Sequence, residues 1–172
     1  ELEKFEDKDV FYSVSNKEKF KNKKIAIFGG GDSALDWALE LSKNSKVILI
    51  HRRNEFRGAP RTLSELEKLK KEGKISIKTP FQIKSINEGD RLNSIVLENH
   101  EGKKETVEAD TILAFFGLIM KLGPIADWGL NIDKKTVLVN TQNFETNKKG
   151  IFAVGDICTY PGKLKLILSG FH

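Results

Sequence analysis

Short apolar runs alternate with amphipathic stretches along the first half of the chain. Residues 23–28, KKIAIF, predict a buried strand, and the glycines that follow predict a turn. Residues 34–43 then predict an amphipathic helix, and residues 46–50, KVILI, predict a second buried strand. The apolar face of that helix consists of Ala34, Leu35, Ala38, Leu39 and Leu41. A strand, a glycine-rich turn, a helix and a strand within about 30 residues form a βαβ unit, in which the two strands are parallel.

The alternation of strand and helix continues after this unit. Residues 61–72 place Leu63, Leu66 and Leu69 three positions apart, which predicts a second helix that ends at Gly73. The first half of the chain therefore has an α/β pattern.

A different pattern occupies residues 74–110. Apolar and polar residues alternate there with a period of two, and Pro80, residues 88–90 and residues 100–102 supply turn signals. These features predict a small antiparallel β-meander that begins with the segment ISIKTP. Residues 111–116 predict a return to a buried strand.

These patterns divide the chain into three parts. Residues 1–22 are polar with scattered aromatic side chains, which predicts an interdomain linker. Residues 23–116 predict a Rossmann-like, three-layer α/β domain that includes the meander. Residues 117–172 lack the regular alternation of helix and strand and predict an incomplete second domain. Because the chain begins at Glu1 and ends within a helix-like pattern, we expect it to be a piece of a longer protein.

Composition and charge narrow the class of protein. With 39% hydrophobic and 31% charged residues, the chain is typical of a soluble globular protein, not of a disordered or collagen-like one. Its longest apolar run, residues 111–120, is about half as long as a membrane span, and the first residues have no apolar signal core. The net charge of +5 comes from lysines interleaved with acidic residues, without an aromatic RNA-binding signature. We therefore expect no membrane or nucleic-acid partner, and an affinity for small anions or an acidic protein.

Cys158 is the one cysteine in the sequence. It has no second thiol with which to form an internal disulfide, a redox dithiol or a zinc cage. This favours a reducing, cytoplasmic setting, and the sequence predicts no metal site. It also predicts no catalytic acid, base or nucleophile, because His51, His100 and His172 show no catalytic partner.

The glycine-rich turn is the first candidate site. Gly29, Gly31 and Ala34 fit the pattern G-x-G-x-x-G/A between a strand and a helix, which suits a tight turn and the close approach of a pyrophosphate. Amides at the start of the helix would face the phosphates, and the Ser33 hydroxyl could donate to a phosphate oxygen. Asp32 adds negative charge there, although it also suits the helix dipole. The alternative is a tight turn that serves only helix packing. The predicted nucleotide-binding turn consists of Gly29, Gly30, Gly31, Asp32, Ser33 and Ala34.

The second candidate site follows the second strand, about 20 residues beyond the turn. A fold that binds NAD usually has an acidic residue there to hold the ribose hydroxyls. This sequence instead has His51, Arg52 and Arg53, and two guanidinium groups can bind a 2′-phosphate through charge-assisted hydrogen bonds. Arg57 could reach the same phosphate, and Arg61 is a weaker candidate. The sequence thus predicts NADP(H) as the ligand, the alternative being a solvated basic loop.

Four segments resemble one known family. They are GGGDSALDWA, HRRNEFR, LGPIADWGL and GIFAVGDICTYPGKLKLILSGF. Together they resemble the thioredoxin-reductase-like flavoproteins, and most closely the type 2 ferredoxin–NADP reductases, over essentially the whole chain. The resemblance implies an NADP domain inserted into an FAD domain, so that residues 23–116 are the NADP domain and residues 117–172 the C-terminal part of the FAD domain.

The resemblance also implies a flavin site. The Asp of the family's GD motif binds the ribityl chain of FAD, which assigns that role to Asp156, with Gly155 and Ile157 beside it. The glycine-rich strand–turn–helix that binds FAD in the family is absent from this sequence. We therefore expect this chain alone to hold FAD poorly and to be inactive.

The reaction implied by the resemblance is hydride transfer from NADPH to N5 of FAD, followed by transfer of single electrons to a ferredoxin or flavodoxin. Full-length family members are typically homodimers. Residues 13–16, SVSN, stand where thioredoxin reductases have Cys-x-x-Cys, which excludes dithiol chemistry at that position. Two alternatives remain open. One is a disulfide reductase that acts through an external thiol protein, and the other is an isolated NADP-binding module without turnover.

Overall fold

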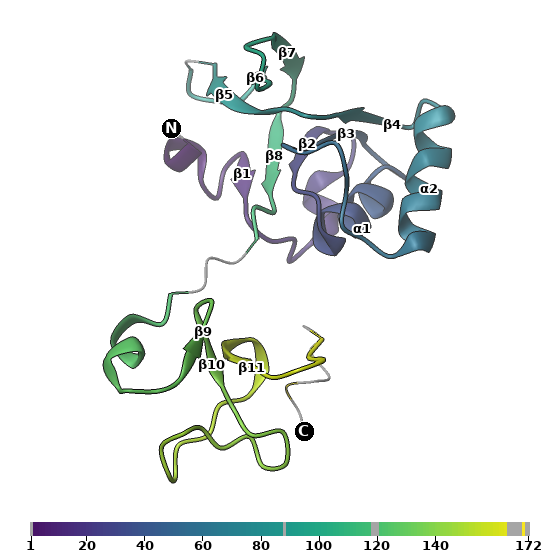
Figure 1. The fold of residues 1–172 in the computed structure, drawn as a ribbon. Helices are drawn as coiled ribbons and strands as arrows, with labels where there is room; N and C mark the ends of the chain where they lie inside the picture. Colours follow the sequence, from purple (N-terminus) through teal and green to yellow (C-terminus); the bar gives the residue numbers. More distant parts are fainter. Residues whose placement is uncertain (1, 88, 118–120, 165–169, 171–172) are drawn as a thin grey trace. The chain divides into compact units, whose positions relative to one another are not determined.

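The chain forms two compact units, Glu1–Gly117 and Leu118–His172 (Figure 1). A computed structural model describes residues 2–87, 89–117, 121–164 and 170. Within the part of the chain that it describes, no helix is both long and apolar enough to cross a bilayer.

The first unit is built on a five-stranded sheet. Its strands are β1 (Val10–Phe11), β2 (Lys24–Phe28), β3 (Lys46–Ile50), β4 (Ile75–Lys78) and β8 (Thr111–Ala114), and its helices are α1 (Asp32–Leu41) and α2 (Pro60–Lys71). The strand order is β1-β8-β2-β3-β4, and every neighbouring pair is parallel. α1 connects β2 to β3, and α2 connects β3 to β4. The predicted α/β class and both predicted helices are confirmed.

Alternate side chains of the sheet enter two separate cores. In β2, Ile25 and Ile27 lie in a core shared with α1 and α2, whereas Ala26 and Phe28 lie in a core shared with an antiparallel sheet. A strand between two apolar layers buries both of its faces in this way. The parallel sheet is therefore the middle of three layers, as predicted (Figure 1).

The antiparallel sheet forms the layer opposite the helices. It contains β5 (Gln82–Ile86), β6 (Ser94–Glu98) and β7 (Lys104–Glu108), in that order. Ile95 and Leu97 of β6 are fully buried in the core shared with β2. The predicted meander is confirmed for these three strands.

The prediction for the segment ISIKTP was wrong. Ile75–Lys78 forms β4, which pairs in parallel with β3 at the edge of the central sheet. Ile75 is buried in the core beneath α2, so this pairing removes apolar surface from water. A period-two pattern over four residues is the same in a parallel and in an antiparallel sheet, so the sequence could not separate the two.

Residues 2–22, the greater part of the predicted linker, pack onto the first unit. They include the edge strand β1 and the 3-10 helices Leu2–Phe5 and Lys17–Phe20. Their buried side chains are Phe5, Asp9, Val10 and Phe20.

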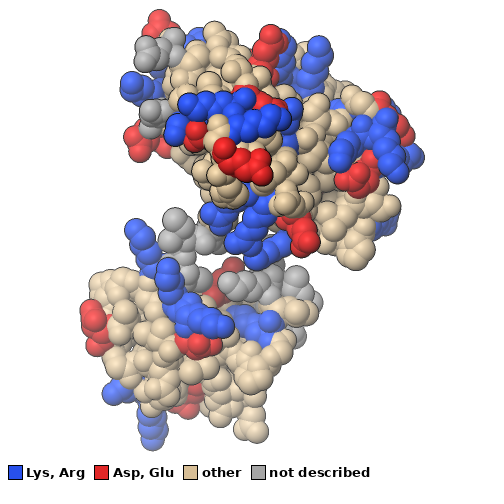
Figure 2. Space-filling model, turned by 45° about the horizontal axis from the view of Figure 1, so that its top comes forward, with Lys and Arg blue, Asp and Glu red and all other residues tan. Residues whose placement is uncertain are grey.

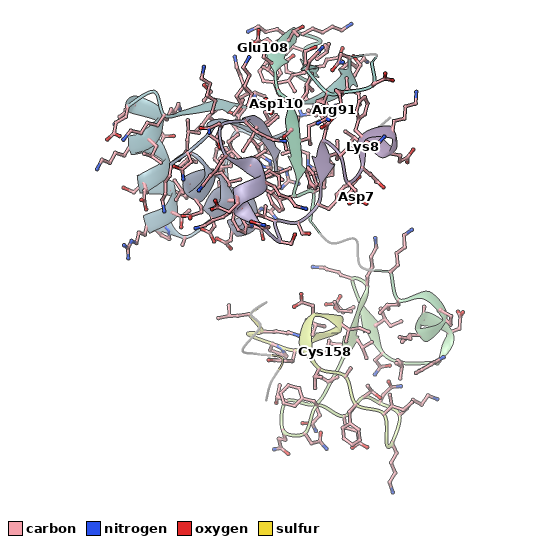
Figure 3. All side chains as sticks on the ribbon, turned by 180° about the vertical axis from the view of Figure 1, so that it is seen from behind. Asp7, Lys8, Arg91, Glu108, Asp110 and Cys158 are labelled. Atoms are coloured by element: carbon pink, nitrogen blue, oxygen red, sulfur yellow. The ribbon has the colours of Figure 1, made fainter. Side chains whose placement is uncertain are left out.

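Asp9 ties this segment to the antiparallel sheet. Arg91, which lies between β5 and β6 (Figure 3), donates from Nε to both carboxylate oxygens of Asp9 at 3.1 and 3.0 Å and from Nη2 to Oδ1 at 2.6 Å. The Leu92 amide donates to Oδ2 at 3.0 Å. Burial opposes the charge on Asp9, but the hydrogen bonds from Arg91 and Leu92 and the charges of Arg91 and Lys23 outweigh it and lower the pKa of Asp9.

The second unit contains a small sheet in the order β11-β10-β9. Its elements are β9 (Ile132–Asp133), β10 (Thr136–Leu138), β11 (Cys158–Thr159) and the 3-10 helices Gly123–Asp127 and Gly155–Ile157. Among its described residues the buried apolar side chains are Leu130, Val137 and Cys158. Larger apolar side chains are exposed, namely Trp128, Ile132, Leu138, Phe152, Val154 and Leu164. The helix-like pattern at residues 171–172 lies outside the described residues.

Candidate dinucleotide site

The glycine turn lies at the carboxyl end of β2, between β2 and the first residue of α1. In the sheet, β2 lies between β3 and β8. The chain continues from β2 to β3 on one side, whereas β8, on the other side, comes later in the sequence. The Gly29 amide donates to the Ile50 carbonyl at 3.0 Å, and the Phe115 amide donates to the Phe28 carbonyl at 2.7 Å. The turn is thus fixed at the point where the strand order reverses, which is where open α/β sheets bind ligands.

Each glycine of the turn has a different reason to lack a side chain. A Cβ on Gly29 would lie 2.7 Å from the Phe115 carbonyl oxygen and 2.8 Å from the Ala34 Cβ, so this glycine and Ala34 permit close packing of helix and strand. A Cβ on Gly30 would lie 2.4 Å from the His51 ring. A Cβ on Gly31 would meet no atom within 4 Å, so the space beside Gly31 is open.

The start of α1 has the form of an anion site. Gly31 is the N-cap residue, and it has no side chain to accept from the first amides of the helix. Ser33 is exposed in the first turn of the helix. The amides, the helix dipole and the open space beside Gly31 together suit a phosphate group.

The Asp32 carboxylate has a hydrogen-bond partner outside this anion position. Its Oδ1 accepts a hydrogen bond from the Ala59 amide at 3.3 Å, on the loop that leads into α2. The sequence offered no signal for this contact, because the two residues are 27 positions apart.

The basic residues follow β3 directly. The His51 ring stacks on Phe56 with ring centroids 5.4 Å apart, and the Arg57 amide donates to the Gly30 carbonyl at 2.6 Å. The structure therefore brings the loop after β3 beside the glycine turn, as the two candidate sites required.

The four arginines of this region have no acidic partner among the described residues. Arg91, the fifth arginine of the chain, is paired with Asp9. The unpaired arginines are Arg52, Arg53, Arg57 and Arg61, and all four are exposed. By contrast, many lysines among the described residues form ion pairs, for example Lys78 with Glu105. Basic and acidic side chains are interleaved on the face shown in Figure 2. Three of these uncompensated guanidinium groups lie on the loop after β3, and Arg61 lies in the first turn of α2. Such a group of unpaired arginines indicates a binding site for an anion.

His51 contributes to the site through the packing of its ring and not through a positive charge. Burial, followed by the positive charges of Arg52, Arg53 and Arg57, lowers the pKa of His51, while a hydrogen bond to the Glu55 backbone opposes this shift. At neutral pH the imidazole is therefore largely uncharged, and the positive charge of the site comes from the arginines.

The three predicted flavin residues form the 3-10 helix Gly155–Ile157 in the second unit. Asp156 is exposed, and no described residue makes a hydrogen bond or ion pair with its carboxylate. The Lys163 ammonium donates to the carbonyl of Gly155 and, at 2.8 Å, to that of Cys158. Cys158 itself is buried (Figure 3) and lies next to this turn, in the role of a packed side chain.

Residues 2–168 match the family described as pyridine nucleotide-disulphide oxidoreductase. This chain belongs to that family. Within it, the chain is 58% identical over 172 residues to a protein of Pelagibacter ubique (strain HTCC1062) named ferredoxin–NADP reductase. It is 49% identical over 174 residues to a protein of the same name from Flavobacterium johnsoniae. The predicted resemblance is confirmed. All of this chain is covered in both cases, but 51% and 49% of the relatives, so the chain spans about half their length.

Solved structures support the fold. Thioredoxin reductase of Lactococcus lactis in its FR conformation is 27% identical, with a TM-score of 0.81 over 98% of this chain and 55% of that one. Thioredoxin reductase of T. acidophilum has a TM-score of 0.83 at 21% identity, with the same coverage, which is a likeness of fold alone.

Proposed function

We propose that this chain carries the NADP site of a ferredoxin–NADP reductase. The main support for this proposal is that an open glycine turn lies beside a loop of arginines without acidic partners among the described residues, at the end of the neighbouring strand. The relatives that bear this name match the whole chain at up to 58% identity.

The two parts of the site suit the two anionic groups of NADP. The pyrophosphate would lie in the open space beside Gly31 and receive hydrogen bonds from the first turn of α1. The 2′-phosphate would lie against Arg52 and Arg53, with Arg57 within the same loop. An acidic residue at the end of β3 would repel that phosphate, and none is present at residues 51–53.

We assign residues 23–116, together with residues 2–22, which pack on them, to the NADP domain. Residues 117–172 would then be part of an FAD domain. The exposed apolar side chains of the second unit support this assignment, because a unit with so small a core is stable when more of a domain covers it. Asp156, on a turn held by Lys163, has a free carboxylate that suits a ribityl hydroxyl, with Gly155 and Ile157 beside it.

In this protein, bound FAD would accept the hydride of NADPH and pass single electrons to a ferredoxin or flavodoxin. The role of the chain's own residues is to bind and orient the two cofactors. Residues 13–16 supply no thiol, and the one cysteine of the sequence is buried, so this part of the protein offers no dithiol to a disulfide substrate. We place the protein in the cytoplasm, on the basis of its lone cysteine, and as a homodimer when full length, on the basis of the resemblance.

Flavin reduction tests this proposal. The FAD-loaded protein, at the length of its relatives, is mixed without oxygen with NADPH or NADH, and the flavin absorbance is followed. We expect fast bleaching with NADPH, slow bleaching with NADH, and reoxidation by an oxidised ferredoxin. Equal rates with the two nucleotides, or reoxidation by a disulfide substrate but not by ferredoxin or flavodoxin, would contradict it.

A further inference from the structure

The arginine loop, defined here as residues 52–58, is attached to the glycine turn at several points. The Arg57 amide donates to the Gly30 carbonyl at 2.6 Å, and Gly31 and Arg57 form a parallel β-bridge. Directly after the loop, the Ala59 amide donates to Asp32 Oδ1 at 3.3 Å. The loop that would bind the 2′-phosphate is thus joined to the turn that would bind the pyrophosphate.

Gly58 permits the close approach of the two segments. A Cβ on Gly58 would lie 2.3 Å from Leu35 Cδ1 and 3.5 Å from Asp32 Oδ1. Leu35 is fully buried in the core under α1 and cannot move aside without disturbing that core. A side chain at residue 58 would therefore push the loop away from α1.

We infer that Asp32 and Gly58 are positioning residues that set the preference for NADP over NAD by holding the arginine loop against α1. Neither residue needs to contact the 2′-phosphate. The inference rests on the proposed NADP site. It also explains why the acidic side chain of Asp32 is tolerated beside the predicted pyrophosphate position, because its carboxylate accepts a hydrogen bond from the Ala59 amide.

A simple charge effect of Asp32 predicts the opposite sign. If Asp32 acted only as a negative charge near the phosphates, its removal would strengthen the binding of the more highly charged NADP. If Asp32 holds the loop, its removal leaves the arginines less well ordered, and NADP binding weakens relative to NAD. The ratio of the two affinities separates these cases, because effects on the shared pyrophosphate cancel in it.

The test is calorimetric titration of the full chain with NADP and with NAD. Asp32→Ala should lower the NADP/NAD affinity ratio about threefold to tenfold, the effect of losing one hydrogen bond. Asp32→Asn, which keeps the acceptor oxygen and removes the charge, should retain a ratio close to that of the unmodified chain. Asp36→Ala is the matched control, because Asp36 is exposed on the same helix and its replacement removes the same charge.

Gly58→Ala provides a second test if Asp32→Ala fails to fold. It should lower the ratio by a similar factor, whereas Gly89→Ala, where a Cβ would make only an ordinary 3.4 Å contact, should not. An unchanged ratio in Asp32→Ala and Gly58→Ala, or a raised ratio in both Asp32→Ala and Asp32→Asn, would overturn the inference. A chain that shows no NADP preference before any substitution would instead overturn the proposed NADP site.

Discussion

Arg52 and Arg53 follow the end of β3, where a fold that binds NAD usually has an acidic residue. Both are exposed, and neither has an acidic partner among the described residues, so their guanidinium groups are available to a ligand. An arginine that already forms an ion pair would have to leave its carboxylate partner to bind a phosphate, so it would contribute less to the binding free energy.

Replacing either arginine should therefore weaken NADP binding selectively. We expect Arg52→Ala or Arg53→Ala to lower NADP affinity on the order of tenfold, because a hydrogen bond to a charged group contributes about 1.5 kcal/mol or more. NAD affinity should change little. Titration of both ligands measures this, with Lys71→Ala, an exposed basic residue at the far end of α2, as the control. An equal loss for NADP and NAD would show that these arginines do not contact the 2′-phosphate.

Gly30 and Gly31 are neighbours in the turn, but an added side chain would meet different surroundings at each. Gly31→Ala should leave the free energy of unfolding nearly unchanged, since its Cβ meets no atom within 4 Å. It should weaken the binding of both nucleotides, because the new methyl group fills the phosphate position. Gly30→Ala should lower the free energy of unfolding by about 1–3 kcal/mol, because its Cβ would displace the His51 ring. Chemical denaturation and nucleotide titration of the two variants measure this. If Gly31→Ala binds NADP normally, the pyrophosphate lies elsewhere.

The elements that hold the site follow from sequence patterns to different degrees. The strand–turn–helix–strand pattern from Lys24 to Ile50 is local and strongly periodic, so β2, α1 and β3 could be predicted with the glycine turn between them. Strand β4 is short and pairs with a distant partner, and its prediction as part of the meander was wrong. The contact between Asp32 and Ala59 could not be predicted, because it depends on how the loop folds back onto α1.

Strand β1 depends on a tertiary contact that no local pattern reveals. It has two residues, and Asp9 before it bonds to Arg91, which is 82 positions away. Asp9→Asn should lower the free energy of unfolding by about 1–3 kcal/mol at neutral pH, because it weakens the charge-assisted hydrogen bonds of a buried carboxylate. Denaturation curves measure this, with Glu108→Gln as the control. Glu108 forms an exposed ion pair with Lys24, so its loss should matter little.

The same pair predicts a pH dependence. Because the pKa of Asp9 is lowered in the folded chain, its stabilisation is complete well above the ordinary value of 3.8 and is lost as the pH falls through and below that value. The difference in stability between the unmodified chain and Asp9→Asn should therefore shrink toward acidic pH. A difference that stays constant from neutral pH to below pH 3.8 would show that the charge of Asp9 contributes nothing.

At the scale of the whole molecule, the two units differ in how much core they possess. The first unit has two apolar cores on the two faces of its sheet. The described residues of the second unit bury Leu130, Val137 and Cys158, while Trp128 and Phe152 are more than half exposed. Burial of apolar surface is the main source of stability, so the first unit should fold without the second.

Separate expression of the units tests this expectation. Residues 1–117 alone should unfold in one cooperative transition and bind NADP with the affinity of the whole chain. Residues 118–172 alone should show no cooperative transition and should bind a hydrophobic dye. Thermal unfolding followed by circular dichroism measures both, and cooperative unfolding of residues 118–172 would contradict the view that more of a domain must cover them.

We expect this chain to bind NADP through the glycine turn and the arginine loop. The most direct measurement is a calorimetric titration of the 172-residue chain with NADP and with NAD in the same buffer of low ionic strength. We predict tighter binding of NADP by on the order of a hundredfold, from the charge-assisted contacts of two arginines to the 2′-phosphate. Equal affinity for the two nucleotides, or binding of neither, would contradict this expectation.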